Sequence, residues 1–243
     1  MPPSTTLETF PEDGIARVLA VVAHPDDMEY GLSGVVHHWT SRGIEVAYLL
    51  LTHGEAGMQR DPALVGPLRA AEQRAACDAV GVDRLTLLNH PDGRLMPTLD
   101  LRRDIAREIR AFRPDAVVTM TWDAVVPWGL NQADHRAAGL SALDACRDAD
   151  NAWVFPDLAE AGLSPWGAQW LLVGGTDAPI HGVALSEGDV DAAVASLSAH
   201  QAYLADLGDH YPSPDDLLRP TFRAHGEGLG VPDAYAFTAY RLR

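Results

Sequence analysis

The sequence predicts an α/β fold: a Rossmann-like, mostly parallel β-sheet with helices on both faces, in a single domain over residues 1–243. Short apolar runs rich in β-branched residues alternate four times with helix-like segments in the first half of the chain, which is typical of parallel sheets. With 47% hydrophobic residues among 243, the chain can bury a full core. It contains neither an internal repeat nor a linker-like tract.

Residues 15–23 (IARVLAVVA) form the first predicted strand, because the run is apolar, rich in β-branched residues and ends at the polar segment HPDD. Residues 99–112 form an amphipathic helix that Pro114 ends. The same criteria predict the remaining elements of the first half: helix 28–42, strand 44–52, helix 69–80, strand 84–88 and strand 116–121.

The second half of the chain is less regular. Its pattern predicts a helix over 134–147, strands over 170–173 and 180–185, and one long alanine-rich helix over 186–207. Residues 209–233 are rich in Pro, Gly, Asp and His and are predicted to form a loop. Residues 234–243 are predicted to end the fold as a strand or a helix.

Charge and composition exclude several classes of function. The formal net charge of −16 repels phosphate backbones and anionic lipids, so we expect no nucleic-acid and no membrane partner. All 18 basic residues are arginine. Schiff-base enzymes, pyridoxal-phosphate enzymes, Walker-type nucleotide sites and protein kinases all require a lysine and are therefore excluded.

The two cysteines and the N-terminal segment suggest a cytoplasmic protein. Cys77 and Cys146 are too few and too far apart for a disulfide framework, and we expect two buried, reduced thiols. Residues 1–14 lack the pattern of a secretory signal, and no apolar run is long enough to span a membrane.

The first strand runs directly into Ala23-His24-Pro25-Asp26-Asp27, which reads either as a metal site or as a turn with solvated acids. Ligands of open parallel sheets bind at the carboxyl ends of the strands, and zinc accepts imidazole nitrogen together with carboxylate oxygen. A catalytic zinc site holds three protein ligands, so a third must come from elsewhere, and Asp134-His135 follows the fourth strand. Iron, cobalt or manganese would also accept these donors.

These residues resemble a known family. AHPDDMEYGLSG, at residues 23–34, resembles the signature of the LmbE-like, or PIG-L, family of zinc-dependent N-deacetylases. Further segments are similar to family motifs in the right order over residues 15–205: Thr52–Gly57, Arg69–Glu72, Asp92-Gly93, Asp134-His135 and Ala199–Gln201.

The resemblance implies a site and a reaction. His24, Asp27 and His135 would ligate one zinc ion per chain, and Asp26 would be the general base. Zinc activates water and polarises an amide carbonyl, so the expected reaction is removal of an N-acetyl or other N-acyl group from an amino sugar or its conjugate. An amidase acting on a larger thiol or natural-product conjugate would use the same site.

One residue departs from the family pattern. Well-described members carry a histidine three residues before the last zinc ligand, and this chain carries Gln132 there. Glutamine donates a hydrogen bond to an oxyanion but cannot act as an acid. Either Asp26 performs both proton transfers, or another group such as His53 assists, or the chain is a catalytically weakened metal- or sugar-binding homologue.

The resemblance also suggests substrate contacts. Arg69, Asp92 and Glu55 would bind sugar hydroxyls, although Arg69 could instead pair with Glu72 in its helix and Asp92 could belong to a simple turn. Aromatic rings stack on sugars, so one member of the set Trp122, Trp128, Trp153, Trp166 and Trp170 could line the pocket, although packing in the core is the commoner fate of a tryptophan. The sequence leaves the acceptor, the acyl group and homo-oligomer formation open.

Overall fold

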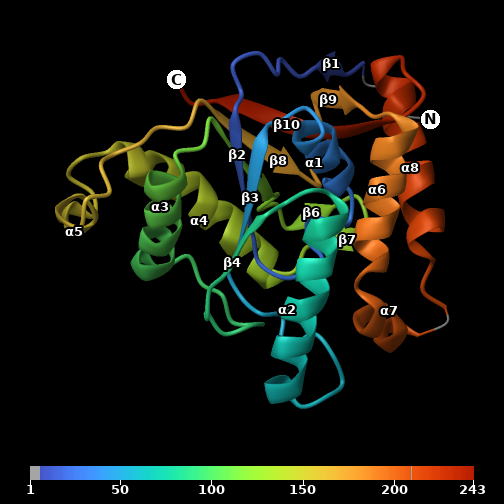
Figure 1. The fold of residues 1–243 in the computed structure, drawn as a ribbon, viewed down its shortest axis with the longest axis horizontal. Helices are drawn as coiled ribbons and strands as arrows, with labels where there is room; N and C mark the ends of the chain where they lie inside the picture. The colour runs from blue at the N-terminus through green and yellow to red at the C-terminus, as the bar shows by residue number, and fades with distance from the viewer. Residues whose placement is uncertain (1–5, 209) are drawn as a thin grey trace.

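A computed structural model describes residues 6–208 and 210–243, and its centre is an eight-stranded sheet (Figure 1). The strand order is β1-β9-β10-β8-β5-β2-β3-β4. The strands of this sheet are β1 (Glu8–Thr9), β2 (Arg17–Val22), β3 (Glu45–Leu50), β4 (Arg84–Leu87), β5 (Ala116–Met120), β8 (Trp170–Gly174), β9 (His181–Ala184) and β10 (Ala234–Arg241). A separate hairpin pairs β6 (Val125–Val126) with β7 (Gly129–Leu130).

The sheet is mostly parallel. Strands β8, β5, β2, β3 and β4 are mutually parallel, whereas β10 is antiparallel to both of its neighbours. From β2 the chain moves outward to β3 and β4 and then returns to the other side of β2 with β5. The strand order therefore reverses between β2 and β5, and in open α/β sheets this reversal creates a crevice at the carboxyl ends of the strands.

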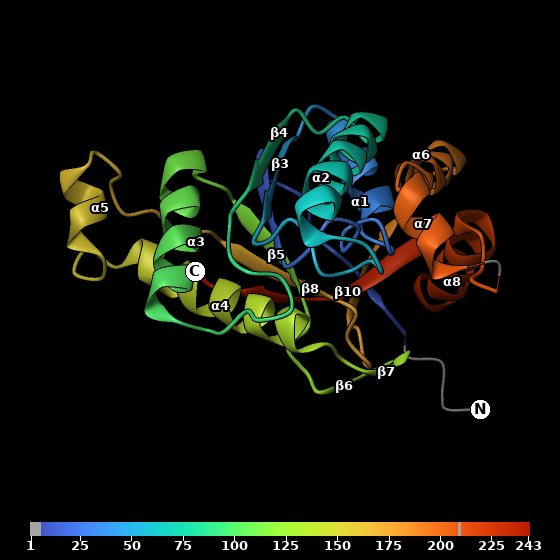
Figure 2. The same ribbon diagram turned by 90° about the horizontal axis from the view of Figure 1, so that it is seen from below.

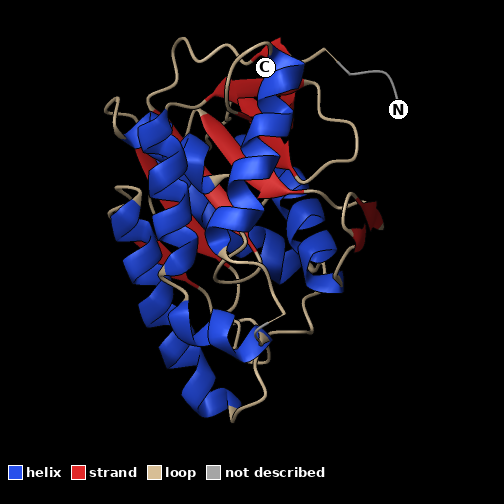
Figure 3. Ribbon diagram, turned by 90° about the vertical axis from the view of Figure 1, so that its right-hand side faces the viewer, coloured by secondary structure: helices blue, strands red, loops and turns tan. Residues whose placement is uncertain are grey.

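Helices cover both faces of the sheet (Figures 2 and 3). The helices are α1 (Ser33–Thr40), α2 (Pro62–Ala79), α3 (Leu99–Phe112), α4 (Ala133–Asp150), α5 (Pro156–Glu160), α6 (Glu187–Ser198), α7 (Gln201–Leu207) and α8 (Pro214–Leu229). Strand β2 explains the two layers, because its side chains alternate between them. Val18, Ala20 and Val22 pack in the cluster that includes α1, α6 and α8, and Leu19 and Val21 in the cluster that includes α3 and α4.

The predicted α/β class is confirmed, and the elements of the first half lie close to their predicted positions. Helix α2 is the main exception there, since it begins at Pro62 rather than at residue 69. The predicted helix over 186–207 is two helices, α6 and α7, which meet at His200.

The predicted loop over 209–233 is wrong, because residues 214–229 form helix α8. The Ser213 side chain accepts a hydrogen bond from the N–H of Asp216, Pro214 occupies the first turn, and Gly230 ends the helix with φ +77°. Ser, Pro and Gly at these positions are helix-cap residues rather than loop residues. Within residues 6–208 and 210–243, every helix is too short or too polar to cross a membrane.

Candidate active site

The candidate site lies at the carboxyl ends of β2 and β5, where the strand order reverses. The chain leaves β2 at Val22 and forms a loop that carries His24, Asp26 and Asp27. After β5 it passes through the β6–β7 hairpin and enters α4, whose first turn carries His135. The fold thus brings together two segments that are more than 100 residues apart.

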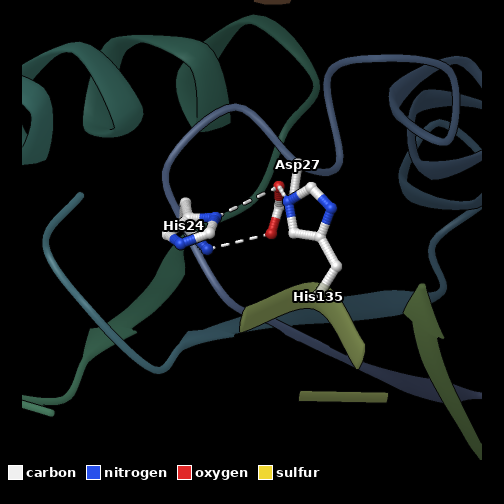
Figure 4. A group of neighbouring side chains, drawn as sticks. All are labelled: His24, Asp27 and His135. Atoms are coloured by element: carbon white, nitrogen blue, oxygen red, sulfur yellow. Dashed lines mark hydrogen bonds and ion pairs between the residues drawn. The ribbon is translucent and has the colours of Figure 1, made fainter. Parts of the chain in front are cut away.

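Three side chains in this crevice place possible metal-ligand atoms close together. His24, Asp27 and His135 each place a ligand atom within 4.8 Å of the other two. Oδ1 of Asp27 lies 3.0 Å from Nε2 of His135 and 3.7 Å from Nδ1 of His24 (Figure 4). Donors about 2.0–2.2 Å from a tetrahedral zinc ion lie about 3.4 Å apart, so this spacing fits such an ion.

Neighbouring groups orient the two imidazoles. Nε2 of His24 contacts Oδ1 of Asp92 at 2.9 Å and Oδ2 of Asp134 at 3.4 Å, which leaves Nδ1 facing Asp27. Nδ1 of His135 contacts Oδ1 of Asn131 at 3.1 Å, which leaves Nε2 facing Asp27. Carboxylate or amide partners on the far ring nitrogen are typical of metal-ligating histidines.

His24, Asp92 and Asp134 form a second group that is close enough to be considered as a metal site. The oxygens of Asp134, however, already accept hydrogen bonds from the backbone N–H groups of Gly93 and Leu95, at 2.8 and 3.1 Å. Asp92 likewise accepts the N–H of Ala56 at 2.7 Å. These hydrogen bonds make the second group a support for His24 rather than an independent centre.

The charges of the first group also suit a cation. Burial acts to raise the pKa of Asp27, but His135 and His24 more than offset it and hold that pKa well below the ordinary value. Asp27 is therefore an anion in the folded protein at neutral pH. An anionic carboxylate between two imidazoles is the donor set that a divalent ion of borderline softness prefers.

Asp26 differs from its neighbour in both environment and backbone. Burial raises its pKa to about 6, against the opposing effect of the Arg69 guanidinium, whose Nη2 lies 3.1 Å from Oδ2 of Asp26. Its φ of +83° lies in the left-handed region that non-glycine residues seldom adopt. Asp26 lines the cavity beside the three donors.

The cavity at the site has a volume of ≈ 200 Å³. Besides the three donors and Asp26, its lining includes Gln132, Arg69, Asp92, Tyr30 and Tyr203. Gln132 is the exposed N-cap residue of α4 and lies at the mouth. Tyr203 places its ring 4.1 Å from Cζ of Arg69 and forms one wall.

Some predicted site residues have other positions. Glu55 and His53 lie outside the cavity lining: Glu55 accepts the N–H of Asp92 at 3.0 Å, and the Cβ atom of His53 lies beside Gly66 of α2. Arg69 does not form the considered pair with Glu72. It donates instead to the carbonyl oxygens of Pro25 and Gly54, at 2.6 and 3.2 Å.

None of the five tryptophans considered for the pocket belongs to the cavity as lined by the described residues. Trp153 is 89% exposed and Trp128 62% exposed, while Trp166 lies between Arg17 and Arg113 near the opposite strand ends. The aromatic residues of the cavity are instead Tyr30, which belongs to the first motif, and Tyr203, which lies two residues after Ala199–Gln201. Proximity to these motifs was the signal that could have identified them.

The fold and the site together define an α/β protein with a candidate divalent-metal centre beside a buried carboxylate. A profile of the PIG-L family, described as GlcNAc-PI de-N-acetylase, matches residues 19–146, slightly more than half of the chain. The chain belongs to this family. The match contains all three candidate ligands and both sides of the crevice.

Similar proteins share names that describe deacetylation. A diacetylchitobiose deacetylase from Thermococcus kodakarensis is 33% identical over 56% of this chain and 51% of its own length, so the match spans about half of that relative. A 1D-myo-inositol 2-acetamido-2-deoxy-alpha-D-glucopyranoside deacetylase from Saccharopolyspora erythraea is 26% identical over 86% of this chain and 77% of its own length.

A solved structure shows the same fold. The N,N'-diacetylchitobiose deacetylase from Pyrococcus horikoshii superimposes with a TM-score of 0.84, covering 95% of this chain and 86% of that chain at 22% identity.

Proposed function

We propose that this protein is a metal-dependent N-deacetylase that hydrolyses the N-acetyl group of an amino sugar or its conjugate. The observation that carries the proposal is the position of Asp26, a buried carboxylate that shares one cavity with the donor set of His24, Asp27 and His135. Family membership and the names of the relatives support the reaction class.

The donor set is proposed to hold one zinc ion. Zinc in this position would supply Lewis acidity and lower the pKa of bound water. Asp27 contributes the negative charge, and the contacts of His24 with Asp92 and of His135 with Asn131 fix the ring orientations. Asp92 and Asp134 thereby act on the centre through His24.

Asp26 is proposed to move the protons. Amide hydrolysis needs a base that takes a proton from the attacking water and an acid that delivers a proton to the departing nitrogen. A carboxyl group with a pKa of about 6 can perform both steps near neutral pH. Because His53 lies outside the cavity, the geometry favours Asp26 as the carrier of both transfers.

Gln132 and Asp92 are proposed to contact the substrate. The Gln132 amide at the mouth can donate a hydrogen bond to the oxyanion that forms when water adds to the carbonyl. Asp92 keeps acceptor capacity for a sugar hydroxyl, since each carboxylate oxygen has two lone-pair sites. Arg69 is proposed to hold Asp26 and the wall formed by Tyr203.

Metal content and amine release test the proposal together. The wild-type protein, D27A and the surface control D215A are purified without a chelator or affinity tag and analysed for metal. We expect about one zinc ion per chain in the wild-type and D215A proteins and its loss in D27A. Absence of metal from the wild-type protein would overturn the ligand assignment and the deacetylase function with it.

Activity is measured as release of primary amine from N,N'-diacetylchitobiose and other N-acetylated sugars. We expect turnover by the wild-type protein and a loss of about 10²–10⁴-fold in D26N with the metal retained. A wild-type protein that binds metal but releases amine only after Q132H would instead be a weakened homologue. Turnover of a bulky thiol-conjugate amide, without turnover of the sugars, would instead establish an amidase that acts on larger conjugates.

A further inference from the structure

Asp26 combines a reactive role with an unfavourable backbone conformation. A non-glycine residue at φ +83° is in a sparsely populated region and persists there only when its surroundings hold it. Arg69 holds the carboxylate and also donates to the carbonyl oxygen of Pro25 at 2.6 Å, in the peptide unit that precedes Asp26. The carbonyl oxygen of Asp26 accepts the N–H groups of Glu29 and Tyr30, at 2.9 and 3.2 Å. The N–H of Asp26 is the remaining backbone group, and it requires a contact of its own.

Gln73 supplies this contact from helix α2. Its Oε1 atom accepts the backbone N–H of Asp26 at 2.9 Å, and its Nε2 atom donates to Oε1 of Glu29 at 3.1 Å. Gln73 is 1% exposed and Glu29 is completely buried. A glutamine suits this position because one end of its amide accepts and the other donates, so one side chain joins an N–H to a carboxylate.

Glu29 is fixed in turn by the α6–α7 region. The Ser196 hydroxyl lies 3.5 Å from Oε1 of Glu29 and also donates to the carbonyl oxygen of Ala76 at 2.9 Å. Nε2 of His200, at the junction of α6 and α7, lies 3.7 Å from Oε2 of Glu29. Glu29 belongs to the first motif and His200 to Ala199–Gln201, but the proposed reaction uses neither of these two side chains.

We propose that Gln73 and Glu29 are positioning residues that act as one unit and hold the backbone of Asp26 in its left-handed conformation. The inference rests on the proposed function, because it assigns these residues to the base of that reaction. The neighbouring residue Glu72 lies on the same helix and is also buried, but it contacts a different segment, since it accepts the N–H of Ala202 at the start of α7.

Near-isosteric apolar variants test whether Gln73 and Glu29 position Asp26 or only stabilise the folded protein. Q73M removes the hydrogen bonds to the Asp26 N–H and to Glu29, and leaves Glu29 buried without its shorter donor. Q73M/E29M removes both partners, which is less destabilising than removing one. E29Q keeps an acceptor for Nε2 of Gln73. T119V, which removes a buried hydrogen bond to the carbonyl oxygen of Val21 inside the sheet, is the matched control.

We expect Q73M to lower kcat for N,N'-diacetylchitobiose by at least about tenfold with KM changed less than about twofold, because the substrate still binds while its base is displaced. Q73M/E29M should regain thermal stability but not kcat, and E29Q should stay within about threefold of the wild-type kcat. T119V should lose stability and keep its kcat.

Crystal structures of the variants provide a readout that does not depend on turnover. In Q73M we expect Asp26 to leave the left-handed region, and in E29Q we expect it to remain there. The inference is overturned if Asp26 keeps its φ in Q73M, or if kcat recovers together with stability in Q73M/E29M. An inactive wild-type protein whose Asp26 still moves in Q73M would refute the proposed function and leave the positioning contact established.

Discussion

Replacing Asp26 with asparagine should stabilise the metal-free protein while removing its proposed base. Burial raises the pKa of Asp26 from 3.8 to about 6, so the folded state disfavours the ionised form. This difference corresponds to about 3 kcal/mol at neutral pH. Asparagine is isosteric and uncharged, and the variant therefore avoids this cost.

The pH dependence has a definite sign. Between the two pKa values the folded state binds more protons than the unfolded state, so the free energy of unfolding falls as pH rises. The loss begins above the unfolded value of 3.8 and is complete above about 6. From about pH 4.5 to about pH 7.5, the wild-type protein should lose about 2 kcal/mol more stability than D26N.

The assay is urea unfolding of both proteins in the presence of a chelator at those two pH values, followed by circular dichroism. We expect the difference between them to be small in acid and to favour D26N near neutral pH. If D26N is no more stable than the wild-type protein at about pH 7.5, the ionised carboxylate is compensated by its surroundings, and the reasoning from burial is refuted.

Two further predictions concern residues outside the site. Arg110 is 2% exposed and donates to the carbonyl oxygens of residues 148, 149, 151, 154 and 155. The variant R110M should therefore lose about 3 kcal/mol of unfolding free energy with unchanged kcat. A loss below about 1 kcal/mol would mean that water replaces the guanidinium. Burial raises the thiol pKa values of Cys77 and Cys146 to about 12, so neither should react with a disulfide reagent near pH 8 until the protein is unfolded; fast labelling of the native protein would contradict this.

The parallel part of the sheet could be predicted from sequence because its strands are buried on both faces. Strands β2, β3 and β5 are mostly apolar runs that end at polar residues, and few other structures produce this pattern. Helix α8 was missed because a count of Pro, Gly and Asp does not distinguish helix caps from loops. Leu218 and Phe222, four residues apart and both buried, were the periodic signal inside it.

His24, Asp26 and Asp27 could be predicted together because they form one motif. His135 was predicted from its position after the fourth strand and from the family resemblance, and the topology places it beside them. Asp134 contacts His24 across 110 residues, and this contact depends on where α4 begins relative to β2. Arg69 illustrates the same limit: helical spacing suggests Glu72 as its partner, but the guanidinium turns to the buried carboxylate of Asp26.

Both the backbone conformation and the ionised form of Asp26 are unfavourable in the folded protein. The residues that oppose these costs, Arg69 and Gln73, lie on α2 rather than in the metal-ligand motif. With the proposed assignments, a chain that kept His24, Asp27 and His135 but lacked these two contacts should keep its metal ligands, yet its base should relax away from the cavity. We therefore expect the proposed hydrolytic activity to depend on the α2 contacts as well as on the ligands, so that the ligand motif alone would not identify an active enzyme.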